Sequence, residues 1–151
     1  MKRLKTATTF AMSLMLFVLL LPASSLAADA SPGVKALISS FHAALKRGDG
    51  KAALALLAED AVIFESGYAE TKSEYTAHHL AGDIEFAKTT TRVVKATASR
   101  CSQATCLVTE QTETTGTYKD KPVKSFGVET TVLEQKDGDW KIVHVHWSSH
   151  K

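Results

Sequence analysis

The stretch GVETTVLEQKDGDWKIVHVHWSS, residues 127–149, decides the fold. Two runs rich in β-branched and aromatic residues flank Asp137-Gly138, a dipeptide that favours a tight two-residue turn. The stretch therefore predicts a β-hairpin that closes a sheet. Its second strand carries two histidines, two tryptophans and two serines, so it also brings polar chemistry to the sheet.

The face on which these side chains lie depends on the turn. With a two- or four-residue loop, Glu129 pairs with His146 and shares a face with both histidines. With a three-residue loop and a glycine bulge, the pairing shifts by one residue, Glu129 opposes Val145, and the histidines lie on the other face. We favour the bulged version, which places Val145 and Trp147 on one face together with Glu129.

Upstream of this hairpin the sequence changes character at Thr89. Apolar residues recur at helical spacing over 34–45, a second short helix follows Asp49, and residues 62–65 form a short strand. Thr71 and Glu74 form a capping box that opens a third helix through Tyr75, His79 and Asp83. Four strands follow, at about 89–101, 106–118, 121–135 and 140–148. The expected fold is α+β: three N-terminal helices packed on a curved antiparallel meander sheet.

The first 27 residues read as a secretory signal peptide. Lys2, Arg3 and Lys5 precede a run of about 12 apolar residues, and Ser25-Leu26-Ala27 offers small residues for cleavage after Ala27. The run is shorter than the roughly 20 residues that a membrane span needs. We therefore expect one domain, residues 28–151, that is periplasmic or secreted and has no membrane anchor after cleavage.

Charge and cysteine content limit the partners. Residues 28–151 hold 15 of the 18 bases and all 16 acids, and the net charge near −1 argues against a nucleic-acid partner. Cys101 and Cys106 are the only cysteines. In an exported chain they predict a disulfide across a hairpin loop.

The order of helices, short strand, helix and meander, ending in W-x-I-V-H-x-H at Trp140–His146, resembles the nuclear transport factor 2-like superfamily, and in particular its SnoaL-like branch. The terminal pattern is also similar to the association domain of calcium/calmodulin-dependent kinase. The resemblance covers about residues 34–149. It implies a cone-shaped half-barrel around a pocket, and a homodimer formed through the sheet. It does not imply one activity, because members include isomerases, cyclases, dehydratases and non-catalytic assembly domains.

Acidic and imidazole side chains are the candidates for proton transfer, since a carboxyl group in an apolar pocket has a raised pKa. His79, Tyr75 and Asp83 fall on one helical stripe, where Asp83 is placed to orient the imidazole. Glu65 ends the short strand just before that helix, whereas His42 is expected on the surface. The candidate catalytic residues are Glu65, His79, Asp83 and Glu129, and the candidate ligand-binding residues are Tyr68, Tyr75, Val145 and Trp147.

Three functions remain open at this point. The first is a pocket that binds a small organic molecule, with or without isomerase, cyclase or hydratase chemistry, and without a cofactor. The second is a periplasmic metal-binding or metal-stress protein that holds Cu or Zn with His144 and His146, which share a strand face in either register. The third is a non-catalytic dimerisation or interaction module. Whether the chain is an enzyme is left open by the sequence.

Overall fold

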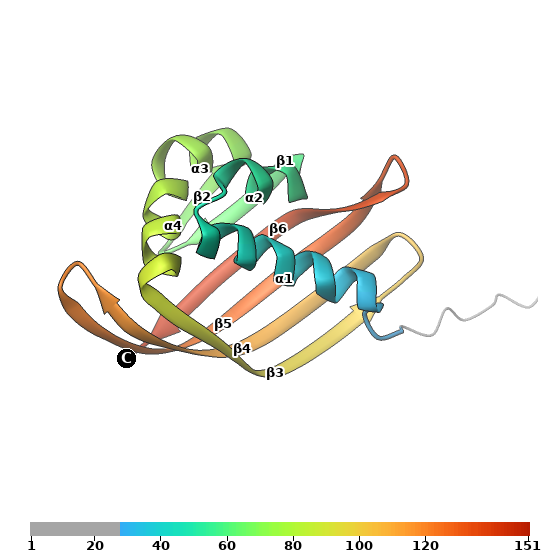
Figure 1. Ribbon diagram of the computed structural model, residues 1–151. Helices are drawn as coiled ribbons and strands as arrows, with labels where there is room; N and C mark the ends of the chain where they lie inside the picture. The colour runs from blue at the N-terminus through green and yellow to red at the C-terminus, as the bar shows by residue number, and fades with distance from the viewer. Residues whose placement is uncertain (1–27) are drawn as a thin grey trace, which may run out of the picture.

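The computed structural model describes residues 28–151, so the predicted signal peptide lies outside the described residues. Four helices precede most of a single six-stranded sheet (Figure 1). The helices are α1 (Pro32–Arg47), α2 (Gly50–Leu56), α3 (Lys72–His78) and α4 (Leu80–Thr89). The strands are β1 (Leu57–Glu65), β2 (Tyr68–Thr71), β3 (Thr90–Cys101), β4 (Thr105–Tyr118), β5 (Lys121–Lys136) and β6 (Asp139–His150). The predicted α+β architecture is confirmed.

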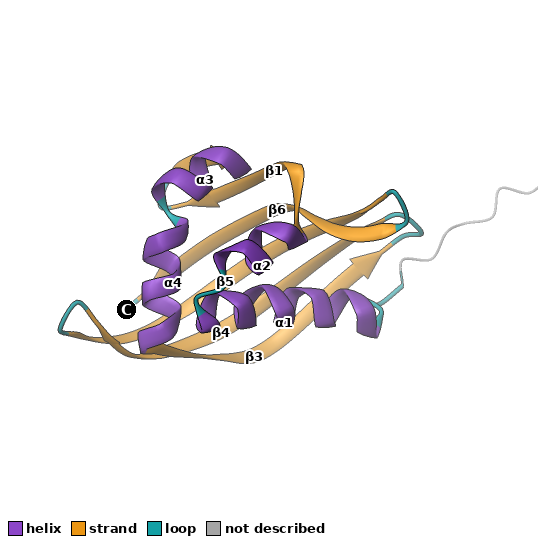
Figure 2. Ribbon diagram, turned by 45° about the horizontal axis from the view of Figure 1, so that its top comes forward, coloured by secondary structure: helices purple, strands orange, loops and turns teal. Residues whose placement is uncertain are grey.

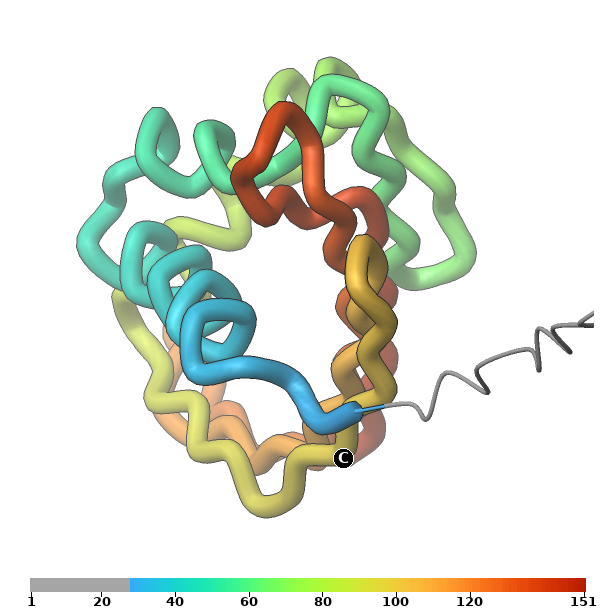
Figure 3. Tube along the Cα trace, turned by 90° about the vertical axis from the view of Figure 1, so that its right-hand side faces the viewer, coloured from blue at the N-terminus to red at the C-terminus, as the bar shows by residue number. Residues whose placement is uncertain are grey.

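The sheet order is β2-β1-β6-β5-β4-β3. The strands β3 to β6 form the predicted antiparallel meander, and the parallel pairing of β1 with β6 joins the β1–β2 hairpin to it. The helices lie on one side of the sheet, as Figure 2 shows. In the view of Figure 3 the strands curve round α1, which gives the fold its cone shape.

Local sequence explains where the long helix begins and ends. Ser31 caps the N-terminus of α1 by accepting a hydrogen bond from Val34 N, and Pro32 follows at a position that needs no N–H donor. Gly48 ends the helix at φ 77°, a left-handed conformation that glycine adopts without steric cost. The buried stripe Val34, Ile38, Phe41, Ala44 and Leu45 faces the sheet.

The third predicted helix is two helices. The capping box of Thr71 and Glu74 is present, but the chain breaks at His79 and restarts as α4. In a straight helix, residues eight apart are about 12 Å apart along the axis. The break brings Tyr75 within hydrogen-bond distance of Asp83. The His79 ring contacts Glu70, so the prediction that Asp83 orients His79 is wrong.

The β5–β6 hairpin differs from both predicted registers. Asp137 and Gly138, at φ 54° and 90°, form a two-residue turn, and Lys136 pairs with Asp139. One residue of β6, Val143, is then left over between the pairs Leu133–Ile142 and Val132–His144. This bulge within the strand shifts the pairing, so Glu129 opposes Trp147 and not Val145. The predicted faces are correct, but the shift arises in β6 and not in the loop.

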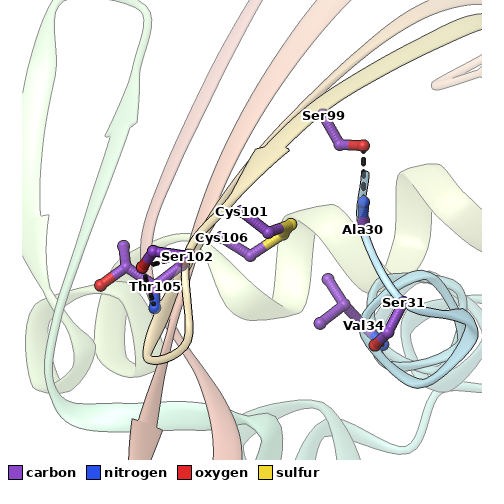
Figure 4. Close-up of a disulfide and its surroundings, with 8 residues drawn as sticks. All are labelled: Ala30, Ser31, Val34, Ser99, Cys101, Ser102, Thr105 and Cys106. Carbon is purple, nitrogen blue, oxygen red and sulfur yellow. Dashed lines mark hydrogen bonds between the residues drawn. A yellow bond between two sulfur atoms is a disulfide. The ribbon is translucent and has the colours of Figure 1, made fainter. Parts of the chain in front are cut away.

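Cys101 and Cys106 form the predicted disulfide and face each other across the β3–β4 hairpin (Figure 4). The first described residues reach the same place. Ala28 and Cys101 exchange two backbone hydrogen bonds of 3.0 and 2.7 Å, and Ala30 N donates to Ser99 Oγ at 2.8 Å. The segment that leads into α1 is therefore hydrogen-bonded to the disulfide hairpin. None of the helices in the described part of the chain has the length and apolarity of a membrane span.

Candidate functional site

A cavity of about 1070 Å³ opens between the helices and the concave face of the sheet, at the end that carries the β4–β5 turn. Its wall combines α1 and α4 with the ends of β1 and β6, the start of β3 and parts of β4 and β5. Of the predicted site residues, Glu65, His79, Asp83, Glu129 and Trp147 line it. The other predicted ligand contacts do not line it: Tyr75 and Val145 are in the core, and Tyr68 is 68% exposed on the edge strand.

The concave face changes from apolar to polar along each strand. Cys106 and Val108 of β4 are buried core residues, whereas the next inward residues of that strand are Glu110, Thr112 and Thr114. Strand pairing carries the same change across the sheet. Glu110 opposes Glu129, which opposes Trp147, and this row marks the boundary between the filled half and the cavity.

Glu129 is the centre of a buried charge network in that row. Four donors surround its carboxylate: Arg92 Nη2 at 3.0 Å, Trp147 Nε1 at 2.9 Å, Thr131 Oγ1 at 2.9 Å and His42 Nε2 at 2.9 Å. Burial raises the pKa of Glu129, but the hydrogen bond and charge of His42, the charge of Arg92 and the Trp147 bond outweigh it and lower the pKa to about 2. Glu129 is therefore ionised at neutral pH. Its carboxylate is occupied by these donors at the cavity floor, whereas a general base needs a free oxygen to accept a proton.

The network contains residues that the sequence did not indicate as a site. His42 was expected on the surface, yet only 21% of its side chain is exposed and it contacts Glu129, so that prediction is wrong. The available signal was its position one helical turn after the buried Ile38. Arg92 bridges Glu129 and Glu110, at 3.0 and 2.6 Å, and no local pattern links these three residues.

A second polar cluster lies at the α3–α4 junction. Tyr75 Oη donates to Asp83 Oδ2 at 2.8 Å, and His79 Nδ1 contacts Glu70 Oε2 at 2.5 Å. Burial, then the negative charge of Glu65, raise the pKa of Asp83 to about 6. Burial also raises the pKa of Glu65, and the bond to Glu70 raises the pKa of His79. The cavity thus has a carboxyl group that takes up and releases protons near neutral pH, beside an imidazole held by its own carboxylate.

The predicted alternative metal ligands, His144 and His146, alternate along β6 with the inward Val145 and Trp147, so their rings are on the convex side of the sheet, with His146 at the rim of the cavity. They pack around the ring of Phe64, at 5.1 and 6.3 Å between ring centroids. Within residues 28–151, the group of three side chains with metal-ligand spacing is His42, Glu110 and Glu129. Arg92 already bridges its two carboxylates, so the cation held there is a guanidinium.

Comparison with known proteins places this architecture in a family. The sequence profile of the SnoaL-like domain matches residues 34–150, and the chain belongs to this family. The class is therefore the SnoaL-like domain with the nuclear transport factor 2-like fold. None of the functionally curated proteins matches the chain.

Solved structures give the same result. A provisionally assigned ketosteroid isomerase from Shewanella frigidimarina is 35% identical, with a TM-score of 0.73 over 78% of this chain and 95% of that one. A provisionally assigned calcium/calmodulin-dependent protein kinase II association domain from Xanthomonas campestris is 23% identical, with a TM-score of 0.68 over 83% and 95%. A provisionally assigned scytalone dehydratase from Novosphingobium aromaticivorans is 15% identical, with a TM-score of 0.66 over 79% and 83%. The last two show the fold alone.

Proposed function

We propose that this domain binds a small, partly apolar organic molecule in the cavity and transfers a proton on it with Asp83. One observation carries the proposal: Asp83 lines the cavity, bonded to Tyr75 and close enough to Glu65 for their charges to interact, with its pKa raised to about 6. A base with a pKa near the working pH combines a large ionised fraction with useful basicity. The chemistry that fits is removal of a proton next to a carbonyl and its return elsewhere, as in isomerases.

His79 is the second proton-transfer group in this proposal. Its contact with Glu70 uses Nδ1, which leaves Nε2 as the ring nitrogen for the cavity. Glu70 fixes the ring orientation and stabilises the imidazolium, so His79 is suited to donate a proton while Asp83 accepts one. The transfer uses only side chains of this chain. A ketone substrate class agrees with the provisional assignment of the Shewanella frigidimarina relative as a ketosteroid isomerase, and for this chain it is part of the proposal.

Exchange of carbon-bound protons tests this function without knowledge of the natural substrate. We expect the wild-type protein in D₂O to accelerate α-proton exchange of 2-decalone or of a β,γ-unsaturated ketosteroid, followed by NMR. Asp83→Asn should reduce this rate by about 10²–10⁴. Glu85→Gln, an exposed change on the same helix, is the control. Exchange no faster than in buffer, or an Asp83→Asn variant as active as wild type, would contradict the proposal.

We also propose that the protein forms a homodimer through the convex face of the sheet. Phe64 of β1, Leu107 of β4 and Val128 of β5 are 39–47% exposed on that face, where β4 and β5 are adjacent and β6 lies between β5 and β1. Exposed apolar residues on adjacent strands mark association surfaces. Leu107→Glu should convert the dimer to a monomer in analytical ultracentrifugation, because Leu107 is exposed and does not line the cavity. A wild-type monomer at micromolar concentration would rule the dimer out. A dimer without any exchange activity would favour the non-catalytic interaction module.

Export completes the proposal and rests on the sequence of residues 1–27. The measured mass of the protein recovered from the periplasm or medium should equal that of a chain that begins at Ala28. A full-length mass in the cytoplasmic fraction would contradict export.

A further inference from the structure

The polar part of the cavity floor contains donors that nothing in the described chain uses. Arg92 makes both of its ion pairs through Nη2, while Nε and Nη1 have no hydrogen-bond partner among the described residues. No buried side-chain nitrogen or oxygen in this part of the chain lacks a partner. The free nitrogens of Arg92 are therefore accessible, and because Arg92 lines the cavity, they are open to it.

Two hydroxyl groups line the same cavity and are likewise without a partner in the described chain. Thr114 of β4 is directly opposite Arg92 of β3, and Thr112 is the next inward residue of β4. Both residues are more than nine-tenths buried and line the cavity, yet neither hydroxyl forms a hydrogen bond within residues 28–151. Their remaining open side is the cavity, so they too are donors available to a ligand.

Gly127 keeps this place open. It lies opposite Thr112 on β5, and its φ is outside the positive range that would require glycine. A Cβ there would lie 2.8 Å from Thr112 Oγ1. The glycine is therefore explained by space next to the hydroxyl and not by backbone conformation.

Charge decides which oxygen fits these donors. Arg92 already contacts the carboxylates of Glu110 and Glu129, so a ligand carboxylate would add a third negative charge to one guanidinium. Such a charge in a half-buried site is costly without a further cation. A carbonyl oxygen accepts the same hydrogen bonds without this cost.

We propose that Arg92, Thr112 and Thr114 form a subsite that binds the carbonyl oxygen of a neutral ligand. This deepens the proposed function, because it specifies the ligand class of the same cavity. Neutral cyclic ketones and lactones are the class that meets both requirements, an acceptor oxygen for the floor and an apolar body for the wall. The subsite determines specificity, whereas Asp83 transfers the proton.

Binding of a matched pair of probes tests the subsite, with 2-decalone as the neutral ketone and 2-naphthoate as the anion of similar size. We expect calorimetry or ligand-observed NMR to show that wild type binds the ketone more tightly. The near-isosteric double variant Thr112→Val/Thr114→Val should weaken ketone binding by about three- to tenfold. Thr115→Val changes the same residue type on the exposed face of the same strand and should leave binding unchanged. Gly127→Ala should weaken ketone binding by filling the space.

Several results would overturn the subsite: tighter binding of 2-naphthoate, no binding of either probe to wild type, or wild-type ketone affinity in both the double variant and Gly127→Ala. A thermal melt of each variant shows whether it is folded. The outcome is separate from that of the proton-transfer proposal. Asp83→Asn should keep ketone affinity while losing exchange, so absent exchange with threonine-dependent binding would remove the catalytic proposal and leave the subsite.

Discussion

The two halves of the concave face lie on the same strands, but one half is packed against the helices and the other lines a cavity. Toward the β3–β4 and β5–β6 turns, inward residues such as Val108, Leu133 and Ile142 are at most 1% exposed and pack under α1. Toward the β4–β5 turn, the inward residues are Arg92, Thr114, Ser125 and Gly127, which line a cavity. The helices cover one half closely and leave the other open.

A single row of side chains separates the packed half of the concave face from the half that lines the cavity. In the row of Glu110, Glu129 and Trp147, four donors satisfy the carboxylate of Glu129, so a charge is held at the edge of the core. Trp147 also stacks on Phe41 of α1, with ring centroids 6.3 Å apart. Through Trp147, which contacts both Phe41 and Glu129, the network connects the packed half to the cavity floor.

The largest expected effect comes from the filled half. Leu133 is completely buried, and Leu133→Ala should lower the free energy of unfolding by about 2–5 kcal/mol because it leaves a cavity. Ser125→Ala, in the open half, should change it by less than about 0.5 kcal/mol. Urea denaturation of both variants measures the difference. Equal losses would mean that the two halves are not distinct.

A smaller effect is expected at the boundary, and it depends on pH. Glu129→Gln should cost about 3 kcal/mol at pH 7. It removes a carboxylate that burial disfavours but that His42, Arg92 and Trp147 stabilise, which together lower its pKa to about 2. The pKa is lowered on folding, so this stabilisation is present above the unfolded value near 4.5 and is lost as the pH falls toward 2. Unfolding curves of both proteins should therefore converge between pH 4.5 and 2. A constant difference across that range would refute the ionised anchor.

The disulfide should contribute about 2 kcal/mol, because it closes a short loop with a sequence separation of 5. The double variant Cys101→Ala/Cys106→Ala measures this contribution in urea denaturation. Hydrogen exchange should accelerate more at Ala28–Ala30, which are bonded to this hairpin, than in α4. Equal acceleration in α4 and at Ala28–Ala30 would mean that the two ends open together.

The smallest expected effect is an increase in the free energy of unfolding. Gly82 lies within α4, and a Cβ there would meet only Tyr118 Oη, at 3.9 Å. Gly82→Ala should therefore raise the free energy of unfolding by about 0.5–1 kcal/mol through helix propensity. A loss on thermal denaturation would show that the open half is packed more tightly than the structure indicates.

The fold was largely predictable because it depends on local signals. The capping box at Thr71, the turn at Asp137-Gly138 and the opposed cysteines act over a few residues, and all three are present. The bulge at Val143 was not predictable in its position, because an extra residue within a strand leaves no distinct local pattern. The side chains lie on the predicted faces, but the register shift comes from a bulge within β6 and not from the predicted three-residue loop.

The site was harder to predict because its contacts join distant segments. His42 and Glu129 are 87 residues apart, and Arg92 and Glu129 are 37 apart. Asp83 was selected from its helical stripe with His79, but its partner is Tyr75, since the helix breaks between them. Periodicity finds candidate side chains, whereas their partners depend on how α1, α4 and the sheet pack.

The most direct test is an NMR titration of the Asp83 carboxyl carbon in wild type and in Glu65→Gln. Our account predicts a midpoint near pH 6 in wild type, with a lower midpoint in the variant because the neighbouring negative charge is removed. A wild-type midpoint near 4, unchanged in Glu65→Gln, would contradict the claim that the open half of the cavity holds a proton-transfer carboxyl group.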